Sequence, residues 1–424
     1  MNYEQPIIGA LIAYPKNIAA AKLTQSDFND PFFGNVLFAM RKLVLRGVGI
    51  DVITLANEIN EANALTKLAQ IQREATYSEK NIAVYAKHIK KASKKRMQAV
   101  FIKRAALDID NEDNVASDLV SNLAGLNNES TDHAYTAKEM LQKTVEDMDI
   151  RHDLKEQGKL AGVPTGMSKI DGILGGFHKS DLIIVGARPA AGKTAYMLSC
   201  AINAAKQGFK VGIISTEMSA VQLGTRVISL TSKVPASTMR DSSYQEADWP
   251  LITASTNMVA GMGLFIYDKP VCTVSDIAIQ AMAWRLSHGL DIVFIDYLTR
   301  IKPEGAENRT IAIGNIATDL KTLARTMNIP VVCLAQLSRE LEKRADKLPL
   351  MSDLRDSGVI EQEADQVLML YRDCIYNDKA PEDSAQINIA KNRHGATPLL
   401  NMRFKPRTME WCDEENYGDY ERMA

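Results

Sequence analysis

The chain has 424 residues, and its 50 lysines and arginines against 52 aspartates and glutamates leave a formal net charge of −2, which argues against a wholly basic coat protein. Hydrophobic residues make up 46% of the sequence and charged residues 24%, as in ordinary globular proteins, and the length allows about two or three domains. No apolar run approaches the roughly 20 residues of a membrane helix and no basic signal-peptide start is present, so we expect a soluble cytoplasmic protein without a membrane partner.

The first part of the chain, residues 1–125, has a helical pattern. Apolar residues recur every three or four positions in stretches such as Asn35 to Arg46 and Ile53 to Asn60, and no convincing strand run interrupts them. The pattern predicts an all-α N-terminal domain. A basic cluster lies between Lys87 and Arg104, and the sequence leaves open whether it is a solvated helix face or a surface for nucleic acid or an acidic partner.

Residues 126–160 are predicted to form a linker that carries one helix. After the polar stretch 126–135, Thr136 and Glu139 have the spacing of a capping box, which marks the start of a helix. An apolar stripe follows on this helix at Leu141, Val145 and Met148. A helix isolated in a linker cannot bury such a stripe on itself, so we expect it to dock on a neighbouring subunit or on its own domain.

Residues 161–424 alternate between short β-rich runs and helical segments, which predicts an α/β domain with a mostly parallel sheet covered by helices. The last two runs are joined across RHGATP and are predicted to form a terminal hairpin. The predicted strands are Leu182 to Gly186, Lys210 to Thr216, Leu264 to Tyr267, Ile292 to Asp296, Pro330 to Gln336, Gln366 to Tyr371, Gln386 to Ala390 and Leu399 to Phe404.

The segment LIIVGARPAAGKT at 182–194 is the most informative motif. An apolar strand leads into a loop of small residues and then into a helix, the arrangement of a P-loop that cradles phosphates with backbone N–H groups and a helix N-terminus. Lys193 is expected to meet the β- and γ-phosphates of ATP, and Thr194 the Mg²⁺ ion. Ala187 stands where the standard spacing has glycine. The predicted nucleotide-binding residues are Arg188, Pro189, Ala190, Ala191, Gly192, Lys193, Thr194 and Ala195.

Three polar residues end predicted strands of the same sheet. Asp296 ends the predicted strand within DIVFIDYL, where a Walker B carboxylate would hold Mg²⁺ together with Thr194. Glu217 follows the strand after the P-loop helix and is the candidate general base, and Gln336 ends PVVCLAQ and is a candidate γ-phosphate sensor. Because the carboxyl ends of parallel strands share one edge, we expect all three near the P-loop.

These residues, together with GVPTGMSKID (162–171), DLRDSGVIEQEADQV (353–367) and IAKNRHG (389–395), closely resemble the bacterial DnaB-type replicative helicases over essentially all of residues 160–410. The N-terminal segments EQPIIGALI and DVITLANEI resemble the helical domain of that family more loosely. The resemblance implies a RecA-like motor domain in a homohexameric ring. Such a ring encircles single-stranded DNA, hydrolyses ATP to translocate along it with 5′–3′ polarity, and unwinds forked DNA. Its N-terminal collar binds primase or a helicase loader.

The resemblance also assigns roles to individual positions. The loop ARPAAGKT is similar to the family's phosphate loop, which commonly has alanine at the position of Ala187. Lys193 and Thr194 keep their P-loop roles, Glu217 matches the catalytic glutamate, Asp296 the Mg²⁺-associated aspartate and Gln336 the sensor. Two further sets of positions match family motifs. Lys391 and Arg393 match a basic pair that reaches the γ-phosphate of an adjacent subunit. Arg355, Asp356 and Gly358 match a loop that contacts the DNA backbone.

Other interpretations remain open from the sequence. A RecA/RadA-type recombinase shares the core fold but forms open filaments and has different terminal domains. An AAA+ loader usually carries Asp-Glu at Walker B, whereas Tyr297 follows Asp296 here. A nucleotide-dependent scaffold would bind ATP without using it for unwinding. For Arg355, local helix capping by the neighbouring aspartates is the alternative to DNA binding.

Overall fold

The computed structural model describes residues 3–18, 21, 23–59, 61, 63–74, 78–108, 136–303, 309–354 and 357–414. Within these ranges the chain forms two compact units, residues 1–131 and 132–424. The polar stretch 126–135 and two residues of the predicted DNA loop, Arg355 and Asp356, lie outside the described residues. None of the helices in the described ranges is long and apolar enough to cross a membrane.

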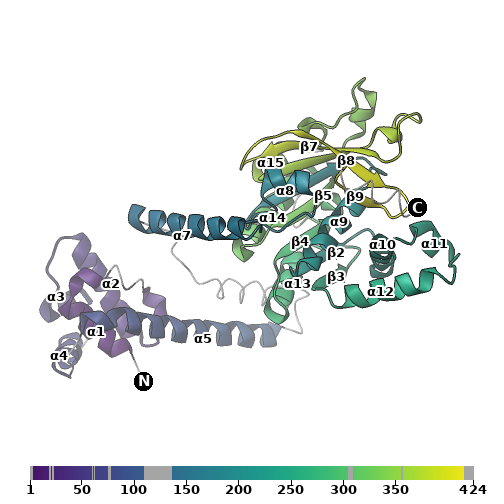
Figure 1. The fold of residues 1–424 in the computed structure, drawn as a ribbon. Coiled ribbons are helices and arrows are strands. Elements are labelled where there is room, and N and C mark those ends of the chain that lie inside the picture. Colours follow the sequence, from purple (N-terminus) through teal and green to yellow (C-terminus); the bar gives the residue numbers. More distant parts are fainter. Residues whose placement is uncertain are drawn as a thin grey trace. The chain divides into compact units, whose positions relative to one another are not determined.

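The described residues of the first unit form helices and short 3₁₀ turns, which confirms the predicted all-α class (Figure 1). Asp30 caps the second helix by accepting a hydrogen bond from the Phe32 backbone N–H, and Ile7, Leu37 and Met40 are among the side chains buried in the shared core. The helices are α1 (Glu4–Ala13), α2 (Pro31–Leu45), α3 (Val52–Ile59), α4 (Ala64–Glu74) and α5 (Ile82–Asp108), with turns η1 (Pro15–Asn17), η2 (Gln25–Asp27) and η3 (Glu79–Asn81).

The predicted basic cluster lies on α5. Lys87, Lys91 and Lys95 are exposed on this helix, whereas Arg96 is half-buried and donates a hydrogen bond of 2.6 Å to the Asp27 carbonyl. This arrangement fits a solvated helix face with one arginine used for packing.

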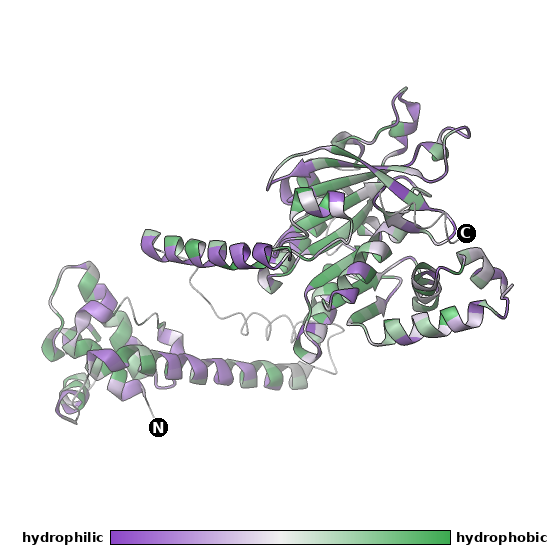
Figure 2. Ribbon diagram, viewed as in Figure 1, coloured by the Kyte–Doolittle hydropathy of each residue, from purple (hydrophilic) through white to green (hydrophobic). Residues whose placement is uncertain are grey.

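Helix α7 (Ala137–Glu156) opens the second unit, and its start follows the predicted capping box. The Thr136 hydroxyl accepts from the Glu139 backbone N–H, and the Glu139 carboxylate accepts from the Thr136 backbone N–H at 2.9 Å. All three residues of the predicted apolar stripe are exposed in the single chain: Leu141 by 57%, Val145 by 55% and Met148 by 63%. Figure 2 shows α7 as a mainly hydrophilic helix with some hydrophobic residues along it.

The second unit contains one nine-stranded sheet in the order β3-β2-β4-β5-β1-β6-β7-β8-β9. The first six strands in this order are parallel, and the last three run antiparallel to their neighbours, which confirms the predicted mostly parallel α/β class. The strands are β1 (Leu182–Ala187), β2 (Val211–Ser215), β3 (Leu264–Asp268), β4 (Ile292–Asp296), β5 (Val331–Gln336), β6 (Gln366–Tyr371), β7 (Ser384–Asn392), β8 (Leu399–Lys405) and β9 (Glu410–Cys412). The short strand β9 was not predicted.

Helices cover both faces of this sheet. Ile183 and Val185 of β1 pack into the same core as α9, whereas Leu182 and Ile184 face the core that contains α13 and α14. Helices α10, α11 and α12 pack on one another beside β3 (Figure 1). The helices are α8 (Ser168–Leu174), α9 (Lys193–Lys206), α10 (Ala220–Ser232), α11 (Ala236–Asp241), α12 (Asp248–Ala260), α13 (Val274–Ser287), α14 (Arg309–Met327) and α15 (Ser357–Glu363), with 3₁₀ turns η4 (Leu298–Arg300), η5 (Arg339–Lys343), η6 (Met351–Asp353) and η7 (Asp373–Ile375).

Candidate nucleotide site

The P-loop leaves the carboxyl end of β1 and enters α9 at Lys193. Ala187 is the last residue of β1, so its backbone is extended and a methyl group is accommodated where other P-loops have glycine. Gly192 has a φ of +90°, and a Cβ there would lie 3.0 Å from Trp411 Nε1, so this position does require glycine. Because α9 begins at Lys193, directly after this glycine, the backbone N–H groups of its first turn lie next to the loop, where an anion can accept hydrogen bonds from them.

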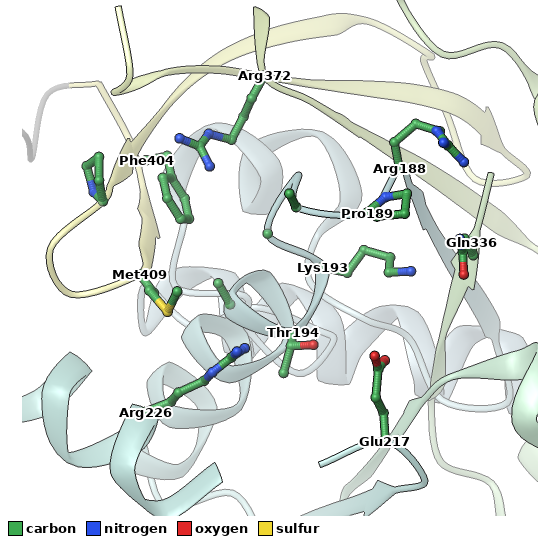
Figure 3. Close-up of a pocket in the computed structure, with 14 residues that line it drawn as sticks. Arg188, Pro189, Lys193, Thr194, Glu217, Arg226, Gln336, Arg372, Phe404 and Met409 are labelled. Atoms are coloured by element: carbon green, nitrogen blue, oxygen red, sulfur yellow. The ribbon is translucent and has the colours of Figure 1, made fainter. Parts of the chain in front are cut away.

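A pocket of about 610 Å³ surrounds the P-loop (Figure 3). Neighbouring strands build one wall, because Glu217 follows β2 and Gln336 ends β5 beside Ala187 of β1. The lining residues are Arg188, Pro189, Ala190, Gly192, Lys193, Thr194, Ala195, Glu217, Arg226, Gln336, Arg372, Phe404, Pro406 and Met409. Ala191 is absent from this lining: its side chain is buried in the core, and its backbone N–H donates to the Arg188 carbonyl.

Asp296 lies at the end of β4, beneath the start of α9. Its side chain is fully buried, and Oδ2 accepts a hydrogen bond of 2.7 Å from the Thr194 hydroxyl. Burial raises the pKa of this carboxyl, while the Thr194 hydrogen bond and the Lys193 charge oppose the rise. Asp296 Oδ1 has no hydrogen-bond partner within the described structure. A buried carboxylate oxygen beside a threonine hydroxyl fits a hard divalent cation such as Mg²⁺.

Lys193 is held over an aromatic ring next to the same carboxylate. Its ammonium lies 4.9 Å from the centroid of Tyr297, the residue after Asp296. Burial lowers the pKa of Lys193, and the charges of Asp296 and Glu217 oppose this effect. The Lys193 ammonium is partly removed from water in this position, and phosphate oxygens could accept charge-assisted hydrogen bonds from it.

Five residues of the pocket were not predicted from the sequence. Arg226 projects from α10, and burial lowers its pKa against the attraction of the nearby carboxylates. Arg372 follows β6 and lies 3.8 Å from the centroid of Phe404, a residue of β8 that lines the pocket with Pro406 and Met409. No local motif marks these positions, because they come from segments far apart in the chain. For Arg372 the sequence did contain one indication, because this basic residue directly follows a predicted strand of the sheet.

The predicted basic pair lies away from this pocket. Asn392 of β7 pairs with Gln366, and Gln366 pairs with Ile183 near the start of β1, so the end of β7 is at the edge opposite the P-loop. Lys391 donates to the carbonyls of Glu361 and Ala364, the latter at 2.7 Å. Arg393 forms an ion pair of 3.1 Å with Asp365. Within one chain these two cations therefore do not reach the nucleotide pocket.

Of the predicted DNA-loop residues, only Gly358 falls in the described ranges, in the first turn of α15. Asp353, just before the loop, is buried and accepts hydrogen bonds from Arg344 and from the Leu350 backbone N–H at 2.8 Å. Asp353 is thus held in place just before the predicted loop, and Lys391 is hydrogen-bonded to the C-terminal end of α15.

The fold and the pocket define a P-loop ATPase with a RecA-like core: a parallel sheet, a phosphate loop after its central strand, and acidic groups at the same edge. The chain matches the family models of the DnaB-like helicase C terminal domain over residues 162–413 and of the DnaB-like helicase N terminal domain over residues 1–91. It therefore belongs to the DnaB-like helicase family, and it is an ATP-dependent replicative DNA helicase.

Relatives span nearly the whole chain. "Replicative DNA helicase DnaB" of Geobacillus stearothermophilus is 33% identical over 417 residues, which is 95% of this chain and 91% of the relative. "Replicative DNA helicase DnaC" of Bacillus subtilis is 33% identical over 418 residues, with the same coverage of both chains. Matches across both halves favour the helicase over the recombinase and loader interpretations.

Solved structures agree with this assignment. One, described as "The Structure Of A DnaB-Like Replicative Helicase And Its Interactions With Primase", has a TM-score of 0.69 and 26% identity, and the match covers 97% of this chain and 99% of that one. A second, described as an ATPase domain, has a TM-score of 0.62 and 29% identity, over 66% of this chain and 99% of that one.

Proposed function

We propose that this helicase hydrolyses Mg²⁺-ATP with residues of its own pocket and completes each site with a basic pair from a second subunit. The observation that carries the proposal is the division of the site between the two edges of one sheet. The P-loop, Glu217, Asp296 and Gln336 lie at the carboxyl edge, and Lys391 and Arg393 at the opposite edge. A head-to-tail ring of subunits would bring the two edges together.

The residues predicted at the nucleotide site have distinct proposed roles. The P-loop N–H groups and Lys193 bind the β- and γ-phosphates, and Thr194 and Asp296 hold Mg²⁺, which supplies charge stabilisation on the phosphates when bound. Glu217 accepts a proton from the attacking water, and Gln336 hydrogen-bonds the γ-phosphate. Arg393 and Lys391 of the neighbouring subunit stabilise the charge that develops on the transferred phosphoryl group.

The proposed assembly is a homohexamer that encircles single-stranded DNA and unwinds forked DNA in the bacterial cytoplasm. Arg355, Asp356 and Gly358 contact the DNA backbone in its lumen, where six copies concentrate positive charge. Residues 1–125 form the collar that binds primase or a loader, and 126–160 the linker. The exposed α7 stripe supports docking of this linker on the adjacent subunit, because those apolar side chains are more than half exposed among the described residues.

Substitution of the proposed base tests the chemistry. The Glu217→Gln helicase is expected to bind ATP with unchanged affinity but to hydrolyse it at least about a hundredfold more slowly, and to lose unwinding of a forked duplex. Glu246→Gln, an exposed change in the turn before α12, is the matched control and should behave like the wild type. Unchanged single-turnover hydrolysis in Glu217→Gln would remove Glu217 from this role.

A further inference from the structure

The side chain of Arg188 is engaged within the protein although it belongs to the P-loop. Its Nε and Nη2 atoms donate to Glu342 Oε1 at 2.9 and 2.5 Å, and Nη1 donates to the Leu337 carbonyl at 2.9 Å. The residue is only 8% exposed, and in Figure 3 it lies on the Gln336 side of the pocket. An arginine whose donors are occupied in this way is already satisfied without a phosphate.

The partner, Glu342, lies in η5, a few residues after the proposed sensor Gln336. The segment 337–344 is attached to the P-loop strand through its backbone as well, because the Leu337 N–H donates to the Ala187 carbonyl at 3.1 Å. The Arg188–Glu342 pair adds a charged contact with two donors to this backbone bond. The end of β1 and the P-loop are therefore joined to Leu337 by two hydrogen bonds and to Glu342 by the ion pair.

The same segment is bonded to the base of the proposed DNA loop. The Ser338 N–H donates to the Asp353 carbonyl at 2.8 Å, and Arg344 Nη2 donates to the Asp353 carboxylate at 2.8 Å. Leu337 and Leu354 form an isolated antiparallel bridge. Arg355 is the next residue in the chain. Residues 337–344 thus have hydrogen bonds to the P-loop on one side and to the residues that precede the loop on the other.

We propose that Arg188 is a positioning residue that transmits the nucleotide state of the P-loop, through Glu342, to the loop that begins after Leu354. The pair makes the P-loop and residues 337–344 move together, so a shift of the P-loop on ATP hydrolysis displaces Asp353. This inference rests on the proposed DNA-binding role of residues 355–358. Arg188 and Lys193 then have different roles in the P-loop, because the Arg188 guanidinium binds protein groups and the Lys193 ammonium binds the phosphates.

The test compares two glutamates of the same 3₁₀ turn in the full-length assembled helicase. Glu342→Gln removes the charge that faces Arg188, whereas Glu340→Gln removes one that faces Lys343 on the surface. ATP hydrolysis is measured without DNA and with an oligo(dT) strand, and oligo(dT) binding is measured by fluorescence anisotropy. Mass measurement establishes that both variants assemble.

For Glu342→Gln we expect kcat and KM for ATP without DNA within about twofold of the wild type, and stimulation by oligo(dT) reduced at least about fivefold. Oligo(dT) affinity should be unchanged, and Glu340→Gln should match the wild type in all measurements. Arg188→Lys combined with Glu342→Gln should reduce the stimulation no further, because both changes break the same contact. Wild-type stimulation in Glu342→Gln would overturn the proposal.

A third variant distinguishes this failure from failure of the proposed DNA loop. If Arg355→Ala abolishes stimulation by oligo(dT) and Glu342→Gln does not, the loop contacts DNA and the role of Arg188 alone is wrong. If Arg355→Ala keeps full binding and stimulation, the DNA-loop assignment is wrong, and the transmission to it is overturned as well.

Discussion

The Thr194 hydroxyl donates a hydrogen bond of 2.7 Å to Asp296 Oδ2, and so joins the first turn of α9 to the end of β4. The second oxygen of Asp296 is buried without a partner in the described structure. The pair thus presents two oxygens of the kind that Mg²⁺ prefers, one neutral and one charged, next to the phosphate loop.

Removal of the Thr194 hydroxyl should therefore weaken the metal site specifically. We expect Thr194→Ala to lower kcat/KM for ATP about ten- to a hundredfold, since a hydrogen bond to a charged group contributes about 1.5–3 kcal/mol. It should also raise the Mg²⁺ concentration needed for half-maximal hydrolysis. Thr194→Ser keeps the hydroxyl and should restore most of the activity.

A matched control lies on α10, where the hydroxyl of the half-buried Thr225 donates to the Val221 carbonyl of its own helix. Thr225→Ala should leave the Mg²⁺ dependence of hydrolysis unchanged. An equal Mg²⁺ requirement in Thr194→Ala and the wild type would contradict the assignment of Thr194 to the metal.

The burial of Asp296 predicts a dependence of stability on pH. Burial raises the pKa of this carboxyl in the folded chain above its ordinary value. The free energy of unfolding of the wild type should therefore fall as the pH rises from about 4, the ordinary aspartate pKa, through the higher pKa of Asp296 in the folded chain. Asp296→Asn does not titrate, so without Mg²⁺ it should be the more stable protein near neutral pH, and the difference should shrink toward acid pH.

Thermal unfolding from pH 5 to 8 measures this difference, with about 2–4 °C expected for each kcal/mol. Added Mg²⁺ and nucleotide should stabilise the wild type and not Asp296→Asn, because the ion binds the ionised carboxylate. A melting temperature of Asp296→Asn below that of the wild type by the same amount at every pH would show that the buried charge carries no such cost.

Sequence patterns predicted most of the residues that the structure gathers at this pocket, because its main parts are local. The strands Ile292–Asp296 and Gln366–Tyr371 were predicted with the bounds that the structure has, since each is a continuous apolar run between polar residues. The capping box at Thr136 was equally visible, because both partners are three residues apart. The parallel sheet then explains why Glu217 and Gln336 meet at one pocket.

The missed parts depend on contacts between distant segments. The short strand β9 has three residues and no periodicity of its own, yet it brings Trp411 against α9. Arg226 and Arg372 enter the pocket from an amphipathic helix and from a strand end, and neither has a spacing that distinguishes it from a surface arginine. The engagement of Arg188 by Glu342 joins residues 154 positions apart, so no local pattern predicts it.

The placement of Arg393 at the edge opposite its own P-loop predicts complementation between subunits. Arg393→Ala and Lys193→Ala helicases should each hydrolyse ATP poorly, since a guanidinium supplied in trans contributes about 10³ to 10⁵ in rate. Mixed before assembly, they should recover activity, because an Arg393→Ala pocket can then face an intact Arg393. ATP hydrolysis across a range of mixing ratios, with assembly followed by mass measurement, checks this.

The control for that experiment is a chain with both substitutions. Mixed with Arg393→Ala chains, the double variant supplies no arginine to any intact pocket and should restore nothing. Action in trans would be contradicted if the double variant restored as much ATP hydrolysis as the Lys193→Ala chain does. It would also be contradicted if no mixing ratio restored hydrolysis although mixed rings form.

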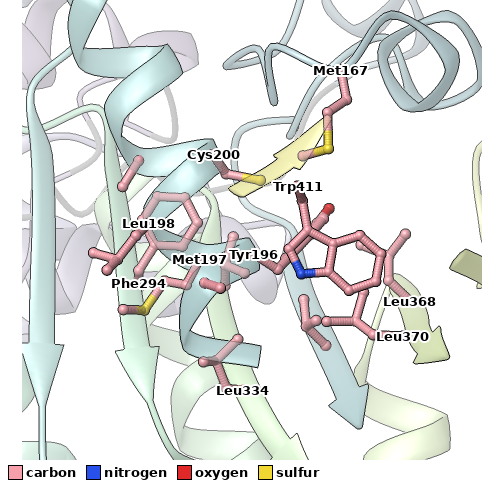
Figure 4. Close-up of a cluster of buried hydrophobic side chains, with 14 of the residues drawn as sticks. Met167, Tyr196, Met197, Leu198, Cys200, Phe294, Leu334, Leu368, Leu370 and Trp411 are labelled. Carbon is pink, nitrogen blue, oxygen red and sulfur yellow. The ribbon is translucent and has the colours of Figure 1, made fainter. Parts of the chain in front are cut away.

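Trp411 connects the end of the domain to the phosphate loop. Its side chain is 1% exposed and lies edge-on to Tyr196 in the buried cluster (Figure 4). Its indole N–H donates to the Gly192 carbonyl at 3.1 Å, and its ring also contacts Phe404 edge-on. Trp411→Phe keeps an aromatic ring but loses the hydrogen bond, so we expect it to lower the free energy of unfolding by about 1 kcal/mol.

The same substitution should raise the KM for ATP, because Gly192 sets the conformation of the loop that meets the phosphates. Urea unfolding and steady-state kinetics measure the two effects, and Trp249→Phe is the control. Trp249 is 54% exposed on α12, so its substitution should change the free energy of unfolding by no more than about 0.5 kcal/mol. If Trp411→Phe matched this control in both stability and KM, the contact with Gly192 would have no part in nucleotide binding.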